Sequence, residues 1–450
     1  MTMPARTPLE DWISRKIGLS PKGALQRQAI ARYQLDALNG TLAHARQHSP
    51  FYRKRLGGLP LWPLASLEDL TAVPFTTVED LRRDPMALLC VSRDRIARAV
   101  TLESSGTTGR PKRLFFTDAD LELTVEFFHH GMATLVNPGQ RVLILMPGTL
   151  PGSVGDLLVK ALARMDVQGI VHGPVNDPEA AIQTARQENI DSLVGIPVQV
   201  LAMARHKQAP RLAGQIRTVL LSTDYVPGAI ANALQRTWRS RVFKHYGMTE
   251  MGLGGAVECM ARNGCHFREA DLLVEIVDPQ TCQPVADGTV GEIVFTTLTR
   301  EGMPLIRYRT GDLAAFKVAP CPCGTVLRTL GAVRGRGIDQ IPLGRHGNLM
   351  IGELDEALFN IEDVLNYHAD IHSAKATDRL SLFITSRQAG ALPCAVDPIR
   401  QAVLSVPAIR AAWEEDLLEI LIRPAEEGTT VSTGTTKRRI QDLRERKIHP

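Results

Sequence analysis

The 450-residue sequence is poor in aromatic residues, which make up 5% of the chain. It also has no uninterrupted apolar run near the ~20 residues that a membrane-spanning helix needs, so we expect no transmembrane segment and no membrane partner. The first fifteen residues include Glu10 and Asp11 and lack the apolar stretch of a signal peptide. These absences predict a cytoplasmic protein.

A strong charge bias is missing as well. Lys and Arg number 52 against 48 Asp and Glu, and the net charge of +4 is too small to predict a nucleic-acid surface. The seven cysteines are an odd number in a long chain, which argues against a disulfide framework. With 44% hydrophobic residues and this length, the chain is expected to form at least two globular domains.

One stretch is unusually rich in glycine and hydroxyl side chains: Ser104, Ser105, Gly106, Thr107, Thr108, Gly109, Arg110, Pro111 and Lys112. It lies between the apolar runs 96–102 and 114–116, which predicts a loop between two strands. Its backbone N–H groups and hydroxyls could donate to phosphate oxygens, because glycine allows a close approach. It lacks the G-x-x-x-x-G-K-[ST] pattern, which disfavours kinases and ordinary ATPases. Taken alone, it is also typical of a solvated turn.

Apolar spacing predicts mainly helix over 21–55, with a break at Asn39-Gly40, and helix starts at Ser66 and Thr77. Short apolar strands then alternate with helices from residue 120 to residue 246, which predicts a parallel sheet. The expected helices are 120–135, 154–165, 177–188 and one from Pro197, and the expected strands are 141–146, 169–171, 192–195, 218–222 and 241–243. Ligands of such sheets bind beyond the carboxyl ends of the strands, where Ser222, Thr223 and Asp224 lie.

The pattern changes near residue 270. The β-branched runs 272–279 and 291–298 flank the turn Asp287-Gly288 and predict antiparallel strands of a small, distorted β-barrel. A flexible junction is expected at 334–337. The predicted fold is therefore α/β: residues 1–335 form a large domain of parallel α/β sheets plus the barrel, and residues 336–450 form a small, mobile α+β lid.

Two further motifs follow the glycine-rich loop: Tyr246-Gly247-Met248-Thr249-Glu250 and Tyr308-Arg309-Thr310-Gly311-Asp312. The three motifs, in this order, resemble those of the adenylate-forming (AMP-binding) superfamily. The phenylacetate-CoA ligase branch is the closer likeness, and it runs over nearly the whole chain. It is carried by Pro50-Phe51-Tyr52, Ser66 to Leu70, Pro74 to Thr77, the block from Leu298 to Arg309, and Cys321-Pro322-Cys323-Gly324.

The resemblance implies an ATP- and Mg²⁺-dependent carboxylate-CoA ligase for an aryl or short acyl acid. Attack of the carboxylate on the α-phosphorus of ATP gives an acyl-AMP and releases pyrophosphate, and the thiol of coenzyme A then displaces AMP. Two alternatives stay open: delivery of the acyl group to a carrier protein or an amine, and a non-catalytic sensor of nucleotide and acid. A homodimer is also left open.

The resemblance also implies roles for particular residues. The loop from Ser104 to Lys112 would hold the β- and γ-phosphates, with Lys112 as a mobile cation. Thr249 would donate to the α-phosphate and Glu250 would hold Mg²⁺, a hard ion that prefers oxygen ligands. Asp312, expected in a turn, would accept from the ribose hydroxyls. The remaining nucleotide-binding candidates are Ser222, Thr223, Asp224, Tyr246, Gly247, Met248, Arg309 and Arg336.

Each motif also has a plainer interpretation. Thr249-Glu250 is typical of a helix start, and Thr310-Gly311-Asp312 of an ordinary turn. The family's catalytic lysine follows a glycine near the C-terminus, but here Gly434 is followed by Thr435. The nearest lysine is Lys437, which either serves the catalytic role or belongs to the basic tail. The family's hinge, Gly-Arg-x-Asp-Asp, is also altered, since Ile338 replaces its first acidic residue.

A separate hypothesis concerns zinc. Cys259, His266, Cys321 and Cys323 supply the Cys₃His set of a closed tetrahedral site, and related ligases carry such residues at these places. Such a site would be structural, and Cys265 is a competing ligand. The alternative is two unconnected thiol clusters. The acyl pocket is expected among residues 147–156, 195–198, 222–225 and 247–253, with His245 beside it.

Overall fold

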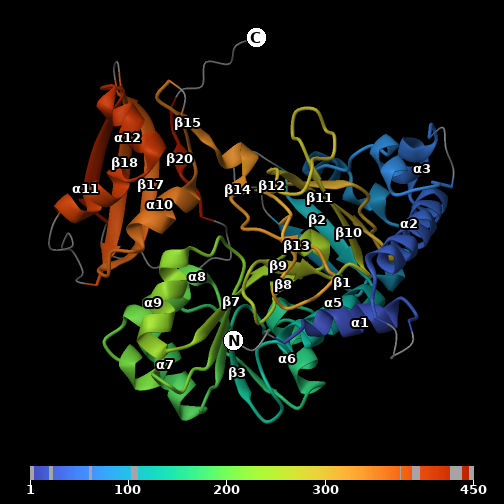
Figure 1. Ribbon diagram of the computed structural model, residues 1–450, viewed down its shortest axis with the longest axis horizontal. Helices are drawn as coiled ribbons and strands as arrows, with labels where there is room; N and C mark the ends of the chain where they lie inside the picture. The colour runs from blue at the N-terminus through green and yellow to red at the C-terminus, as the bar shows by residue number, and fades with distance from the viewer. Residues whose placement is uncertain are drawn as a thin grey trace. The chain divides into compact units, whose positions relative to one another are not determined.

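The computed structural model describes residues 5–19, 24–59, 63–102, 110–345, 347–374, 377–387, 396–425 and 438–444. The chain forms two compact units (Figure 1). The first unit consists of Met1–Gly139, Gly148–Gln168 and Phe243–Val333. The second consists of Gln140–Pro147, Gly169–Val242 and Arg334–Pro450. None of the helices in the described part combines the length and apolar character that a membrane crossing needs.

The first unit begins with three helices, α1 (Pro8–Lys16), α2 (Arg27–His48) and α3 (Pro50–Leu56). The predicted break at Asn39-Gly40 is wrong, because α2 runs through it. The Asn39 amide exchanges hydrogen bonds with the main chain of Leu64 at 3.0 and 2.9 Å, and this tertiary contact outweighs the low helix propensity of Asn and Gly. The break falls instead at Ser49, which is extended and accepts from the Tyr52 N–H before Pro50 starts α3.

Short elements connect these helices to the first hairpin: η1 (Glu68–Ala72), α4 (Val78–Arg83), η2 (Pro85–Leu88) and η3 (Arg93–Arg95). The predicted helix start at Thr77 is confirmed, since Thr77 and Asp80 form a capping box. Strands β1 (Arg98–Leu102) and β2 (Lys112–Phe116) pair antiparallel, with Leu102 opposite Lys112. The glycine-rich stretch therefore connects two strands as predicted, and its residues 104–109 lie outside the described part.

The rest of the first unit consists of helices α5 (Asp118–Met132) and α6 (Val154–Ala163) and two antiparallel ladders. One ladder joins β7 (Arg241–Tyr246), β8 (Ala256–Glu258), β9 (Cys265–Phe267) and β13 (Thr329–Leu330). Strands β8 and β9 were not predicted, because three-residue strands carry almost no periodicity. The other ladder joins β10 (Leu272–Val277), β11 (Gly291–Thr297) and β12 (Tyr308–Ala314) and confirms the antiparallel prediction. The barrel itself stays a prediction.

The second unit contains the predicted parallel sheet. Strand β5 (Ser192–Gly195) pairs in parallel with β3 (Arg141–Leu145) and β6 (Thr218–Leu221), while β4 (Gln168–Val171) is a further short strand. Helices α7 (Pro178–Gln187), α8 (Pro197–Arg205), η4 (Ala209–Leu212) and α9 (Gly228–Trp238) alternate with the strands. Every residue of β5 and β6 is buried, as expected for a sheet covered on both faces.

Residues 334–444 add a second sheet to this unit, in which β17 (Val364–Ala374) pairs antiparallel with β18 (Thr377–Ser386). Strand β19 (Leu418–Pro424) runs parallel to β18, and β20 (Gln441–Asp442) parallel to β17. The other elements are β14 (Gly335–Arg336), η6 (Gly337–Asp339), β15 (Ile341–Leu343), β16 (Gly347–Leu349), α10 (Ile351–Leu358), α11 (Val396–Leu404) and α12 (Pro407–Glu414).

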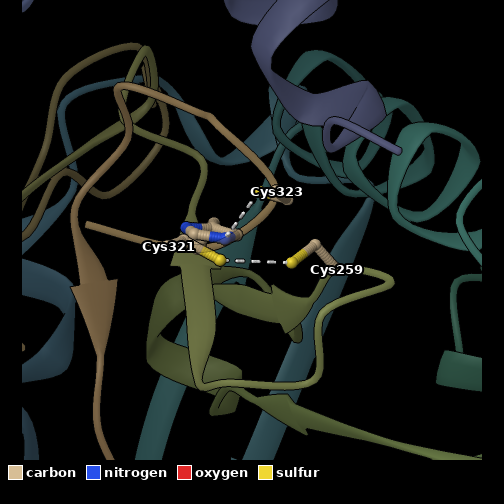
Figure 2. Close-up of side chains that lie close together, drawn as sticks. Cys259, Cys321 and Cys323 are labelled. Atoms are coloured by element: carbon tan, nitrogen blue, oxygen red, sulfur yellow. Dashed lines mark hydrogen bonds between the residues drawn. The ribbon is translucent and has the colours of Figure 1, made fainter. Parts of the chain in front are cut away.

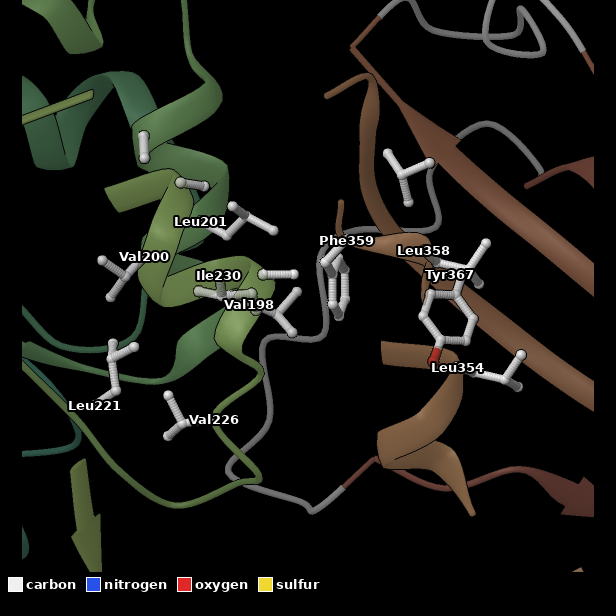
Figure 3. Close-up of a cluster of buried hydrophobic side chains, with 14 of the residues drawn as sticks. Val198, Val200, Leu201, Leu221, Val226, Ile230, Leu354, Leu358, Phe359 and Tyr367 are labelled. Atoms are coloured by element: carbon white, nitrogen blue, oxygen red, sulfur yellow. The ribbon is translucent and has the colours of Figure 1, made fainter. Parts of the chain in front are cut away.

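One hydrophobic core joins the two sheets of the second unit. Figure 3 shows Val198 and Ile230, from α8 and α9, facing Phe359, which follows α10. The guanidinium of Arg205, at the end of α8, donates to the carbonyl oxygens of Phe359 and Val364. The C-terminal segment thus packs on residues 169–242 in this structure, and its division and mobility as a lid stay predictions.

Candidate active site and metal centre

Lys112 and Glu250 form the centre of the candidate site in the first unit. Lys112 begins β2, directly after the glycine-rich loop, and its Nζ forms an ion pair with Glu250 Oε1. Glu250 lies in η5 (Thr249–Met251) and is 3% exposed. The Tyr308 hydroxyl donates to the same oxygen at 3.1 Å. Burial favours a raised pKa, but the charge of Lys112 and these hydrogen bonds outweigh it, and the pKa of Glu250 is lowered. The carboxylate is therefore ionised at neutral pH.

Two buried arginines support the main chain around Glu250. Arg300 Nη1 donates to the Glu250 carbonyl at 2.8 Å, and its Nη2 donates to the Phe115 carbonyl at 3.1 Å. Arg268 donates to the carbonyls of Met251 and Leu123. Arg300 thereby joins the strand after the glycine-rich loop to the helix that carries Glu250. Arg300 lies in the block from Leu298 to Arg309, but the sequence predicted no role for it.

Asp312 lies in a bulged part of strand β12, so the predicted turn is wrong. Arg309 pairs with Val294 and Leu313 with Glu292, which leaves three residues of β12 opposite Ile293 alone. Gly311, with φ of +76°, allows this bulge, and the Thr310 hydroxyl donates to the Ile293 carbonyl at 2.7 Å. Turn-like residues inside a strand are typical of a bulge, and sequence spacing does not separate the two.

A hydrogen bond connects the second and third motifs. The Tyr246 hydroxyl donates to Asp312 Oδ2 at 2.9 Å, although 66 residues separate them. Asp312 is 1% exposed. The structure therefore brings Tyr246, Glu250 and Asp312 into one unit with Lys112, and their roles toward a nucleotide stay predictions.

Arg309 is held by Glu292. Its Nε and Nη2 donate to Glu292 Oε2 at 2.8 and 2.5 Å, so its charge is already compensated within the first unit. Arg336 lies in β14 of the second unit. The predictions for Lys437 and for residues 104–109 concern residues outside the described part.

Gly247 and Met248 connect β7 to η5. A Cβ at Gly247 would lie 2.9 Å from the Leu253 carbonyl oxygen and 2.8 Å from His245 Cε1, so only glycine fits there. The plainer interpretation made Thr249 a helix N-cap and Glu250 a first-turn acid. It is confirmed only for Glu250, because the N-cap of η5 is Met248, and η5 has only three residues. His245 packs against the rings of Phe127 and Phe128, with centroids 5.9 and 6.5 Å away. Burial and the charge of Arg268 lower its pKa to about 4, so the imidazole is neutral at pH 7.

Ser222, Thr223 and Asp224 follow β6 in the second unit, as predicted. The Ser222 N–H donates to the Gly195 carbonyl at 3.1 Å. Thr223 has φ of +82°, which is strained for a β-branched residue and is typical of functional loops. Asp224 Oδ2 accepts from the Arg438 N–H at 3.3 Å.

The cysteine and histidine candidates converge in the first unit. The ligand atoms of Cys259, His266, Cys321 and Cys323 all lie within 4.8 Å of one another, and the four residues are buried. Cys259 Sγ lies 3.5 Å from Cys321 Sγ, and Cys323 Sγ lies 3.8 Å from His266 Nε2 (Figure 2). The alternative of two unconnected thiol clusters is therefore wrong.

The orientation of His266 suits a metal ligand. Its Nδ1 lies 3.2 Å from the Arg328 carbonyl oxygen, which places the proton on Nδ1 and leaves the Nε2 lone pair available to a metal ion. The pKa of Cys323 is lowered because the Cys259 thiol donates to it. Cys265, the competing ligand, points elsewhere: its Sγ lies 3.6 Å from the Lys244 carbonyl.

Comparisons with known proteins show which family the chain belongs to. The family model of the AMP-binding enzymes matches residues 95–298. Phenylacetate-coenzyme A ligase of Thermus thermophilus is 30% identical over 351 residues, which are 76% of this chain and 78% of that protein. The Escherichia coli phenylacetate-coenzyme A ligase is 27% identical over 389 residues, 82% of this chain and 85% of that one.

A solved structure supports the fold. 2-Hydroxyisobutyryl-CoA ligase in its postadenylation state, in complex with R3-HIB-AMP, matches with a TM-score of 0.77 and 20% identity. The match covers 92% of this chain and 89% of that one. The 30% identity with the Thermus thermophilus ligase over 76% of this chain identifies an adenylate-forming enzyme. Within that superfamily, the chain belongs to the phenylacetate-CoA ligase-like branch of the AMP-binding family.

Proposed function

We propose that the protein is an ATP-dependent carboxylate-CoA ligase that activates an aryl or short acyl acid as acyl-AMP. The observation that carries the proposal is the cluster Lys112–Glu250–Tyr308 beside the end of the glycine-rich loop, in a chain 30% identical to a phenylacetate-coenzyme A ligase. The enzyme must hold an anionic acid near anionic phosphates, and this requires cations and oriented donors.

The described residues suit this task. Lys112 provides a cation at the end of the loop, and a polyphosphate in that loop would compete with Glu250 for it. Asp312, fixed by the Tyr246 hydroxyl, would accept from the ribose hydroxyls. Thr249 would donate to the α-phosphate. Ser222, Thr223, Asp224, Arg309 and Arg336 remain proposed nucleotide-binding residues, and Lys437 the proposed lysine for the acid.

Glu250 fits magnesium, because an ionised carboxylate is the oxygen ligand that Mg²⁺ prefers, together with phosphate and water. The lowered pKa of Glu250 keeps that carboxylate charged although its side chain is buried. When bound, the ion would neutralise charge that develops on the phosphates. Release of Lys112 from Glu250 toward the phosphates would leave the carboxylate for this ligation.

We also propose a structural zinc ion at Cys259, His266, Cys321 and Cys323. Three thiols and one imidazole nitrogen match the donor set that zinc takes in closed sites, and all four residues are 4% exposed or less. Four protein ligands leave no open position for a substrate. The ion would join β9 to the segment before β13, so its contribution would be to stability rather than to chemistry.

Formation of AMP tests the reaction. The purified protein is incubated with ATP, Mg²⁺ and a panel of aryl and short-chain acids, with and without coenzyme A, and acyl-CoA is detected by mass spectrometry. We expect acid-dependent AMP and the matching acyl-CoA for one or a few acids. Acyl-hydroxamate trapped without any thioester would instead support a carrier protein or an amine as acceptor. Binding of ATP and acid without AMP would support a sensor.

A further inference from the structure

Helix α10, in the second unit, carries two adjacent carboxylates near its C-terminal end, Asp355 and Glu356. Acids at this end of a helix oppose the helix dipole, so they do not stabilise α10 itself. Adjacent helical residues point about 100° apart, which directs the two carboxylates to different partners. Both sets of partners belong to the same unit as α10.

Glu356 holds the loop that follows β6. Its Oε1 accepts from the Tyr225 hydroxyl and the Gly228 N–H, both at 2.8 Å, and its Oε2 accepts from the Ala229 N–H at 3.2 Å. Pro227, the N-cap residue of α9, makes no side-chain cap among the described residues. Glu356 therefore supplies both the hydrogen bonds and the negative charge that the N-terminus of α9 needs.

Asp355 holds Arg438. Its Oδ1 accepts from Arg438 Nη1 at 2.5 Å and from the Tyr367 hydroxyl at 2.6 Å. The Arg438 guanidinium also lies 4.5 Å from the centroid of the Tyr367 ring and 5.0 Å from that of Phe359. The side chains of Asp355 and Arg438 are 3% and 12% exposed, so this is a nearly buried ion pair with aromatic walls.

The two sets of contacts meet at Asp224. The Arg438 N–H donates to Asp224 Oδ2 at 3.3 Å, so the segment fixed by Asp355 is bonded to the loop fixed by Glu356. This loop carries three of the proposed nucleotide-binding residues, and Arg438 directly follows the proposed lysine, Lys437, in the sequence. Thr223 in the same loop is strained at φ of +82°, and such strain persists only where the surroundings hold it.

We infer that Asp355 and Glu356 are positioning residues for the acid-activation step: they hold the loop 222–229 and Arg438 in one arrangement. The inference rests on the proposed function. Neither carboxylate touches a reacting atom, and their effect passes through Asp224, Tyr225 and Arg438. Disturbing this arrangement should therefore lower the rate of acyl-AMP formation more strongly than it lowers the stability of the fold.

The test measures the two half-reactions separately in the full-length protein. The first rate is acyl-hydroxamate formation from ATP, Mg²⁺ and an acid that the wild type turns over, without coenzyme A. The second is acyl-CoA formation from the synthetic acyl-AMP of that acid and coenzyme A. For Glu356→Gln and Asp355→Asn we expect the first rate to fall about tenfold or more and the second to stay within about twofold.

Controls separate positioning from folding. Glu362→Gln changes an acid whose side chain is 80% exposed and should alter neither rate. If Asp355→Asn fails to fold, Tyr225→Phe still removes one hydroxyl bond to Glu356 while its ring stays packed near Gly352, and it should lower the first rate selectively. Amide hydrogen exchange of Gly228, Ala229 and Arg438 should become faster in Glu356→Gln or Asp355→Asn.

Equal losses in both half-reactions, or an unchanged first rate, would overturn the inference and leave the proposed function intact. Unchanged amide exchange in the folded variants would overturn it as well. A wild type that forms no acyl-AMP with any acid would contradict the proposed function itself, and with it the inference. That failure is recognisable because it appears before any substitution is made.

Discussion

Lys112 and Glu250 lie 138 residues apart in the sequence, and their side chains form an ion pair. One ends the glycine-rich motif and the other ends the Tyr246–Glu250 motif, so a single contact connects two of the three motifs. Glu250 is nearly buried, and Tyr308, from the third motif, donates to the same carboxylate oxygen. All three motifs thus converge on one carboxylate.

Removing the carboxylate charge of Glu250 should slow the activation of the acid as acyl-AMP. We expect Glu250→Gln to lower the rate of acyl-AMP formation about a hundredfold. The variant lacks the carboxylate that would bind Mg²⁺, the ion that offsets the charge of the phosphates. Acyl-hydroxamate formation over a range of Mg²⁺ concentrations measures this. Glu301→Gln serves as a control, since Glu301 pairs with Arg95 nearer the surface and should retain the wild-type rate. A normal rate and Mg²⁺ dependence in Glu250→Gln would exclude the metal role.

Asp312 should act on nucleotide affinity. Asp312→Asn replaces a charged acceptor by a neutral amide, and we expect the KM for ATP to rise about tenfold to a hundredfold. Tyr246→Phe removes the hydroxyl that donates to Asp312 and should raise the KM in the same direction by a smaller factor. Steady-state kinetics at saturating acid give both values. An unchanged KM in Asp312→Asn would show that this carboxylate does not bind the ribose.

Zinc should be bound to protein that is purified without chelators, at about one ion per chain. Cys323→Ser should lose the metal and lower the Tm by about 5–10 °C, because the ion joins segments far apart in the sequence. The matched control is Cys265→Ser: this cysteine adjoins His266 in sequence, but its thiol faces the Lys244 carbonyl, so zinc should remain. Elemental analysis showing no zinc in the wild type would end the hypothesis.

His245 predicts a pH dependence of stability. Its pKa is lowered from 6.5 to about 4 in the folded protein, so the unfolded chain binds more protons between these values. Stability from the neutral imidazole is therefore present above pH 6.5 and is lost as the pH falls toward 4, by on the order of 1 to 3 kcal/mol.

The test is the difference in Tm between the wild type and the His245→Gln variant. This difference should become smaller from pH 7.5 to pH 5. A difference for His245→Gln that does not change with pH would contradict the prediction.

Much of the fold could be predicted from local patterns. Short apolar strands between amphipathic helices predicted the parallel sheet of the second unit, and β-branched runs predicted β10 and β11. Among the strands that were missed, β8 and β9 are too short for periodicity. The bulge at Asp312 contains the residues of a turn. The break at Asn39-Gly40 was wrong because a contact with Leu64 overrides propensity.

The candidate site could be predicted only in part. Motif order identified Glu250 and Asp312, and donor chemistry identified the Cys₃His set. Arg268 and Arg300 carried no such signal, because they act on main-chain carbonyls, and a carbonyl partner leaves no mark in the sequence. Asp355 and Glu356 were missed for a related reason: two acids in a helix usually indicate a solvated face.

The sequence by itself determined the residue types and their order: the three motifs, the four metal-ligand candidates, and the alternation of strands and helices. Those features depend on local chemistry and periodicity, which a linear chain displays. Only the tertiary structure decided that Lys112 meets Glu250, that Cys259 meets Cys321, and that Arg438 meets Asp355. Such pairs depend on long-range packing, where burial makes each uncompensated charge costly and so selects the partner.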